Sequence, residues 1–131
     1  MGLSAARALL EHGLSGLMIF DLDLGQAEDK IQELRTEFPA ATISSTVVNI
    51  TDDVALGQAV VETVKQLGSI DILLCFAGVV GCIHAIEMTG TEFKRVLDIN
   101  TTGSFLCAQA VAKEMIKQGM YFLATNASVK T

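Results

Sequence analysis

Apolar side chains recur along this chain at two spacings, and segments with one spacing alternate with segments with the other. Leu3, Ala6 and Leu10 fall on one face of a helix, which Gly13 would end. The run that follows at 16–21 is short and continuously apolar, as in a buried strand. The same reasoning predicts further helices over 25–37, 51–68 and 91–118, and further strands over 42–48, 70–78 and 121–128.

Alternation of helices with buried strands is typical of an α/β protein, in which a parallel sheet carries helices on both faces. The chain has 131 residues and no linker or repeat, so we expect a single domain over 1–131. In such a sheet each helix follows a strand, yet no strand precedes the helix predicted at 3–12. The pattern therefore predicts a doubly wound sheet that lacks its first strand.

Charge and composition exclude several kinds of partner. The net charge is −6 and the nine Lys and Arg residues form no run, so binding to nucleic acid or to an anionic membrane is not expected. No stretch reaches the ~20 apolar residues of a membrane span. His12 and His84 lack partner ligands at metal spacing, so no metal site is predicted. The three cysteines are Cys75, Cys82 and Cys107, and they lack Cys-x-x-Cys spacing. We therefore predict that they are reduced thiols, as expected in the cytoplasm.

Ligands of open parallel sheets bind at the carboxyl ends of the strands. Asp21 ends the first predicted strand and follows Gly2 by 19 positions, a spacing at which a carboxylate can accept hydrogen bonds from an adenosine ribose. A solvated aspartate that caps the helix at 25–37 fits the same spacing, and both interpretations stay open. The other strand ends carry Asn49 and Ile50, Ala77 and Gly78, and Ser128.

Five short motifs, in order along the chain, resemble those of the short-chain dehydrogenase/reductase family. "MGL" is similar to the end of the family's Thr-Gly-x-x-x-Gly-x-Gly loop, and "FDLD" to the segment with its ribose-binding acid. "NITDD" resembles the adenine-side segment, "CFAG" the Asn-Asn-Ala-Gly turn and "DINTTGSF" the Asn-x-x-Gly helix segment. The resemblance implies a Rossmann-type fold that binds a nicotinamide dinucleotide and moves hydride to or from an alcohol or ketone.

The resemblance also implies roles for individual residues. Gly2 would be the third loop glycine, and Asp21 would bind the ribose and repel a 2′-phosphate, which favours NAD over NADP. Asn49 and Ile50 would lie on the adenine side, and Ala77 and Gly78 would form a turn against the cofactor. Asn100 matches the family's catalytic asparagine, and Ser128 its substrate-orienting serine.

Some positions depart from the family pattern. Asn49 replaces the usual aspartate, although an amide can still pair with the adenine edge. Phe76 replaces an asparagine of the glycine turn and so removes a polar tether. Asn100 also has a simpler interpretation, as an asparagine that relieves strain in a long helix.

The family's acid-base pair is absent from this sequence. It consists of a tyrosine followed four residues later by a lysine, which lowers the pKa of the phenol. The one tyrosine here is Tyr121, and Thr125 lies four residues on. We therefore expect the chain to be a fragment, truncated at both ends and lacking the C-terminal half of the fold, that is inactive as it stands.

Three functional interpretations follow. The chain is part of an oxidoreductase acting on a secondary alcohol or ketone, and "DLD…AED" and "FAGVVGCIHAIE" resemble the fungal sugar-alcohol and ketose branch. Alternatively, it is a non-catalytic protein that pairs with full-length relatives, or with itself, through the helix at 101–118. The third interpretation is an unstable truncated product with no activity of its own.

Overall fold

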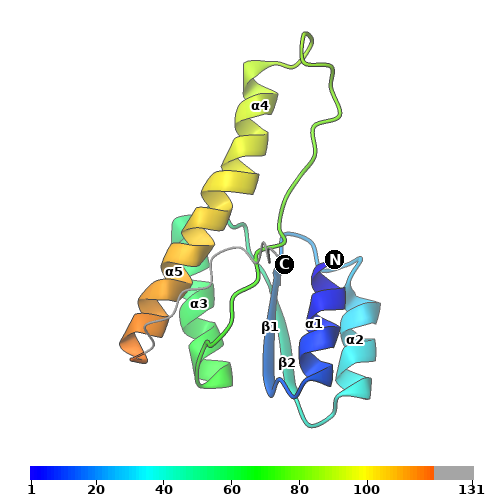
Figure 1. Cartoon of the computed structure of the whole chain (residues 1–131), viewed down its shortest axis with the longest axis vertical. Helices are drawn as coiled ribbons and strands as arrows, with labels where there is room; N and C mark the ends of the chain where they lie inside the picture. The colour runs from blue at the N-terminus through cyan, green and yellow to red at the C-terminus, as the bar shows by residue number, and fades with distance from the viewer. Residues whose placement is uncertain (120–131) are drawn as a thin grey trace, which may run out of the picture.

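The computed structural model describes residues 1–119, which form two strands and several helices (Figure 1). The elements in chain order are α1 (Gly2–Glu11), β1 (Gly16–Asp21), α2 (Glu28–Glu37), β2 (Thr42–Val47), α3 (Asp53–Leu67), α4 (Gly90–Leu97), a π-helical segment η1 (Asp98–Gly103) and α5 (Ser104–Lys117). The fold is α/β, as predicted. The last predicted strand and Ser128 lie outside the described residues.

β1 and β2 form a parallel pair, from Gly16 opposite Thr42 to Asp21 opposite Val47. Helices cover both faces of the pair, with α1 and α2 on one side and α3 and α5 on the other (Figure 1). Each face has its own apolar core. Ile31, Leu34 and Ile43 are central to the first, and Leu56, Val60 and Val111 to the second.

Local sequence explains where the helices begin and end. The Asp52 carboxylate caps α3, accepting hydrogen bonds from the backbone N–H groups of Val54 at 3.1 Å and Ala55 at 3.0 Å. Gly68 ends α3 with φ of +89°, a conformation that favours glycine. The helix predicted over 91–118 is observed as α4, η1 and α5 in succession, and its one irregularity is the π-helical segment around Asn100.

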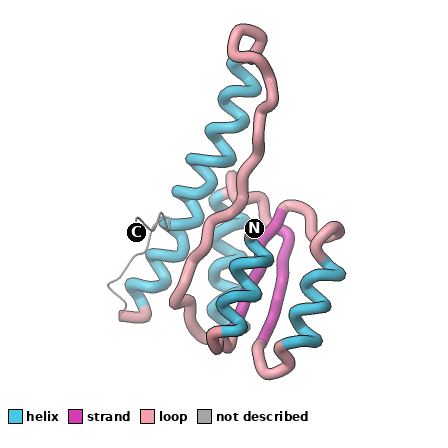
Figure 2. The backbone as a smooth tube through the Cα atoms, turned by 45° about the vertical axis from the view of Figure 1, so that its right-hand side comes forward, coloured by secondary structure: helices cyan, strands magenta, loops and turns pink. Residues whose placement is uncertain are grey.

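The strand predicted over 70–78 is wrong: residues 70–79 form no strand in the structure. This stretch, the 70–79 segment, runs as extended loop beside α1 and α5 (Figure 2). Leu73 and Cys75 pack on the second core, whereas Ile72, Leu74 and Phe76 remain 40–52% exposed. A strand needs a neighbour for its backbone groups, and within residues 1–119 the ladder of β1 is made with β2.

Side-chain amides hold the backbone of the 70–79 segment instead. Gln118, just beyond α5, accepts a hydrogen bond from the N–H of Ile70 and donates one to its C=O, each at 3.0 Å. At the other end, Asn100 accepts from the N–H of Val79 at 2.8 Å and donates to its C=O at 2.9 Å. The segment is thus fixed at both ends to one continuous helical stretch.

Candidate functional site

Asp21 and Asn49 lie at the carboxyl ends of the two paired strands. The N–H of Val48 donates to the C=O of Asp21 at 2.8 Å, which keeps the two strand ends adjacent. One Asp21 oxygen accepts from the N–H of Asp23 at 3.2 Å, and the side chain is exposed. The amide oxygen of Asn49 accepts from Thr51 N–H at 3.1 Å and Thr51 O–H at 2.8 Å. Both polar groups are therefore oriented by their own turns and open to a ligand.

The N-terminus of α1 reaches the same end of the sheet, next to the 70–79 segment. A Cβ placed on Gly2 would lie 3.7 Å from the Cβ of Phe76, in ordinary van der Waals contact. α1 has no side-chain cap hydrogen bond, and its first turn carries no acidic residue. Its first backbone N–H groups are therefore suited to an anion. Phe76 provides an apolar contact where the family pattern has an asparagine.

The side-chain amide of Asn100 makes two hydrogen bonds to the backbone of Val79, the Asn100 amide clamp, and so lies next to Gly78. A Cβ on Gly78 would lie 3.3 Å from Oδ1 of Asn100, closer than most real contacts, so glycine keeps this approach free. Ala77 and Gly78 are both exposed. The backbone C=O of Asn100 accepts from the hydroxyl of Ser104 at 3.1 Å. The side chain of Asn100 is therefore used to hold the glycine turn in place.

Ile50 packs on the π-helical segment at Gly103. The sequence motifs did not predict Gly103 as a site residue. A Cβ on Gly103 would lie 2.6 Å from Cδ1 of Ile50, so an alanine there would push the Ile50 side chain away. Gly103 is buried. It lies within the quoted motif "DINTTGSF", whose Asn-x-x-Gly spacing was the signal that could have identified it.

The predicted cofactor residues thus fall into contacting pairs near the end of the sheet where β1 and β2 finish. Gly2 meets Phe76, Gly78 meets Asn100, and Ile50 meets Gly103, while Asp21 and Asn49 end neighbouring strands. Figure 1 shows the N-terminus of α1 at the end of the sheet where β1 and β2 finish. Ser128 lies beyond the described residues and is not placed relative to these pairs.

Two thiols lie close to this region. Cys107 of α5 is buried in the second core, and Cys75 of the 70–79 segment packs against that core. The neighbouring Cys107 thiol lowers the pKa of Cys75 to about 7, against the opposing effect of burial. The pKa of Cys107 is raised, first by its interaction with Cys75 and then by burial. Among residues 1–119, no group of three or more His, Cys, Asp or Glu side chains is placed to hold a metal ion.

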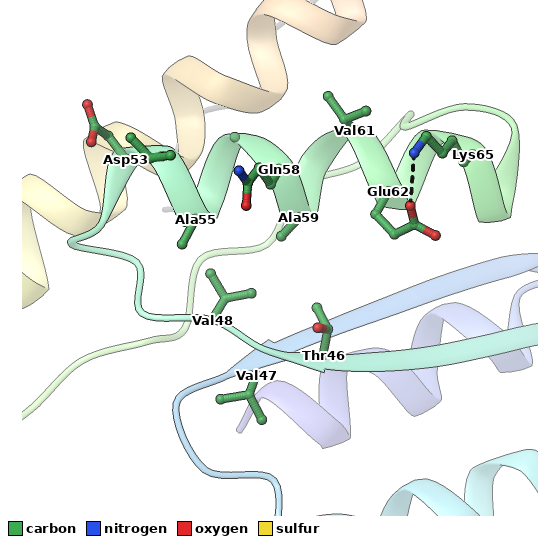
Figure 3. Close-up of a pocket in the computed structure, with 12 residues that line it drawn as sticks. Thr46, Val47, Val48, Asp53, Ala55, Gln58, Ala59, Val61, Glu62 and Lys65 are labelled. Atoms are coloured by element: carbon green, nitrogen blue, oxygen red, sulfur yellow. Dashed lines mark hydrogen bonds and ion pairs between the residues drawn. The ribbon is translucent and has the colours of Figure 1, made fainter.

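A separate groove of about 770 Å³ lies along α3 and the outer side of β2 (Figure 3). Asp53, Gln58 and Lys65 line it from α3, opposite Thr46 and Val47 of β2. Lys65 pairs with Glu62 within the helix, at 3.3 Å. None of the predicted cofactor residues lines this groove, so it is distinct from the candidate site.

Comparison with known proteins gives consistent matches over nearly the whole chain. A family model described as Enoyl-(Acyl carrier protein) reductase matches residues 1–130. The 2-dehydro-3-deoxy-L-rhamnonate dehydrogenase (NAD(+)) of a Sphingomonas species is 30% identical over 95% of this chain and 47% of its own length. The sorbitol dehydrogenase of Cereibacter sphaeroides is 30% identical over 91% of this chain and 44% of its own length.

Solved structures match the fold with similar coverage. An NAD+-bound xylitol dehydrogenase superposes with a TM-score of 0.83 at 30% identity, over 91% of this chain and 45% of that one. A gluconate 5-dehydrogenase from Burkholderia cenocepacia, in complex with NADP and tartrate, gives 0.77 at 28% identity, over 90% and 45%. The chain spans about half the length of the relatives it matches. Within residues 1–119, no helix is both long enough and apolar enough to cross a membrane.

Proposed function

Because the chain belongs to the short-chain dehydrogenase/reductase family, we propose that it forms the cofactor-binding half of an NAD(P)-dependent oxidoreductase that interconverts a secondary alcohol and a ketone. The observation that carries this proposal is the amide clamp of Asn100 on Val79, which fixes the Gly78 turn. The exposed Asp21 and the uncapped N-terminus of α1 supply complementary groups for a ribose and an anion.

The residues present fit a dinucleotide by their chemistry. The N–H groups at the start of α1 would hold the pyrophosphate, and Gly2 leaves room for its approach. Asp21 would accept hydrogen bonds from the ribose hydroxyls and repel a 2′-phosphate, so NAD is the proposed cofactor. Asn49 and Ile50 would border the adenine. Bound NAD would supply hydride chemistry, and these residues would bind and orient it.

Residues nearer the reacting atoms have a different role in this proposal. Asn100 would position the Gly78 turn through the clamp on Val79, and Ser128 would orient the substrate. The sequence contains no Tyr-x-x-x-Lys pair, since Thr125 stands four residues after Tyr121. Proton transfer to or from the substrate therefore has no group of the family's kind in this chain. The chain would bind cofactor without turning over an alcohol.

A polyol or ketose is the proposed substrate class of the intact enzyme. Matched relatives include enzymes named for sorbitol, xylitol and gluconate, and hydroxylated carbon chains of this kind carry the secondary alcohol that the chemistry needs. Free cysteines suit the reducing cytoplasm that the sequence predicts. We place the protein there as part of the same proposal.

Calorimetric titration of the chain with NAD and NADP tests the cofactor assignment. We expect NAD to bind more tightly, and Asp21→Ser to reduce the NAD/NADP ratio of affinities by about tenfold, which corresponds to about 1.4 kcal/mol. Asp29→Ser, an exposed aspartate of α2, is the matched control and should leave the ratio unchanged. An unchanged ratio in Asp21→Ser, or no saturable binding of either dinucleotide, would refute the assignment.

A second candidate function rests on the outer face of α5. Phe105 and Ile116 are 60% and 64% exposed and lie three helical turns apart on one side of the helix. Such an apolar face favours pairing through the helix at 101–118, either with another copy or with a full-length relative. Light scattering would show a dimer that Phe105→Asp converts to a monomer, and Lys113→Asp would serve as a control on the same helix.

A further inference from the structure

The 70–79 segment and the helical stretch from Asn100 to Gln118 match each other in length. The nine residue-to-residue steps from Ile70 to Val79 span about 30 Å in an extended chain, and the eighteen steps from Asn100 to Gln118 span about 27 Å in a helix. The amide clamps join the two at both ends, in antiparallel order. The segment is therefore laid along the helix in a fixed register.

The same register brings two cysteines together. Both distances start from the hydrogen bonds that join Ile70 to Gln118. Cys75 is five residues from Ile70, about 16 Å along the extended segment. Cys107 is eleven residues from Gln118, also about 16 Å along the helix. Cys107 is buried in the second core, and Cys75 packs against that same core. Cys82, the third cysteine, is exposed and lies beyond the clamped stretch.

We propose that Cys75 and Cys107 form a reversible redox site, in which a peroxide converts the two thiols into a disulfide that fastens the 70–79 segment to α5. This site is independent of the cofactor proposal. Cys75 is the more accessible thiol, half-buried between the exposed Leu74 and Phe76, whereas Cys107 is buried. Cys75 therefore meets the oxidant and Cys107 resolves the intermediate.

The chemistry balances with hydrogen peroxide as the oxidant. The Cys75 thiolate attacks one peroxide oxygen, the O–O bond breaks, and the products are a sulfenic acid and, after protonation, one water. The Cys107 sulfur then attacks the Cys75 sulfur, the S–O bond breaks, and the hydroxide leaves as a second water with the proton of Cys107. Two thiols lose two electrons in total, and a dithiol such as dithiothreitol restores them by exchange.

The neighbouring Cys107 thiol lowers the pKa of Cys75, which makes the first step favourable near neutral pH. The pKa of Cys75 lies at about 7, so a large fraction of this thiol is thiolate at that pH. The disulfide would close a loop that contains α4 and η1, and it would restrict the unfolded chain. We expect the oxidised protein to unfold several degrees higher than the reduced protein.

The test is peptide mapping of the whole chain under non-reducing conditions, before and after treatment with hydrogen peroxide. We expect a linked pair of peptides containing Cys75 and Cys107, a loss of two hydrogen masses, and reversal by dithiothreitol. Cys82→Ser is the matched control and should form the same link. In Cys107→Ser the reaction should stop at a sulfenic acid on Cys75, which dimedone traps.

Three results would overturn the proposal. Cys75 and Cys107 could both remain free thiols while Cys82 is oxidised, the linked peptides could contain Cys82, or the link could join two chains. The mapping is decisive on the parent chain alone, so a Cys107→Ser chain that failed to fold would leave the test intact. Oxidised Cys82→Ser should also show the higher unfolding temperature, and an unchanged temperature with the link present would remove the fastening role.

Discussion

The β1–β2 pair and the 70–79 segment are both extended and rich in apolar residues, yet only the pair forms a sheet. β1 and β2 share a continuous parallel ladder from Gly16 to Asp21, whereas the 70–79 segment is held at Ile70 and Val79 by side-chain amides. The apolar pattern predicts that both regions are extended and contact a core. An extended segment becomes a strand only where a neighbouring backbone can form hydrogen bonds with it.

The two regions also divide the candidate site between them. The paired strands carry Asp21 and Asn49, which would recognise the adenosine end of a dinucleotide. The amide-held segment carries Ala77 and Gly78, which would face the opposite end of the cofactor. Both regions, although held by different forces, would therefore act on one ligand.

The largest expected effect is the absence of turnover. Neither region supplies a Tyr-x-x-x-Lys pair, and proton transfer of this kind contributes about 10²–10⁴-fold to catalysis. We expect no oxidation of sorbitol, xylitol or other secondary alcohols by this chain with NAD or NADP, measured as absorbance at the reduced nicotinamide band. Sustained turnover that Asn100→Ala abolishes would contradict this expectation.

Matched isoleucines measure how differently the two regions are packed. Ile43 of β2 is 8% exposed in the first core, whereas Ile72 of the 70–79 segment is 52% exposed. Ile43→Ala should lower the free energy of unfolding by about 2–5 kcal/mol, because it leaves a cavity. Ile72→Ala should lower it by less than about 1 kcal/mol. Urea denaturation measures both, and equal losses would show that the segment is packed like a strand.

Removing the Gln118 side chain tests whether its hydrogen bonds to Ile70 hold the 70–79 segment in place. Gln118→Ala takes away two hydrogen bonds to the backbone of Ile70 and should cost about 1–2 kcal/mol. Amide hydrogen exchange should accelerate at Ile70 and stay unchanged in β1. Gln109→Ala, on the exposed side of α5, is the matched control. If exchange at Ile70 were the same in Gln118→Ala as in the parent, the clamp would have no structural role.

The smallest effect concerns the pH dependence of Cys75. Its pKa is lowered to about 7 by the neighbouring Cys107 thiol, so the thiolate predominates above that pH and the thiol below it. Alkylation of Cys75 by iodoacetamide should accelerate as pH rises through about 7. In Cys107→Ala the midpoint should move up toward the ordinary thiol value of about 8.5. Mass spectrometry of the Cys75 peptide gives the rates, and identical midpoints would contradict the assignment.

Much of the fold could be predicted from short-range patterns. Helical spacing and the capping residue identified α1 and α3 to within two residues, and the apolar runs at 16–21 and 42–48 became β1 and β2. The strand at 70–78 could not be judged in this way, because its formation depends on a partner far away in the sequence. A local pattern carries no information about that partner.

The candidate site likewise has features that short-range patterns predict and features that depend on distant segments. Asp21, Asn49 and Gly78 were predicted as site residues from strand ends and motifs. The clamp that joins Asn100 to Val79 and the packing of Ile50 on Gly103 required coordinates, because each joins segments distant in sequence. Phe76 was noted as a departure from the family pattern, and its contact with Gly2 became visible only in three dimensions.

The most direct test of a site shared by the two regions is a titration of the isotopically labelled chain with NAD, followed by the backbone amide signals of Asp21, Asn49 and Gly78. We predict that all three signals shift together with one saturation curve, and that NADP produces the same shifts at about tenfold higher concentration. Shifts confined to one of the two regions, or curves with different midpoints, would contradict the claim that both regions hold one dinucleotide.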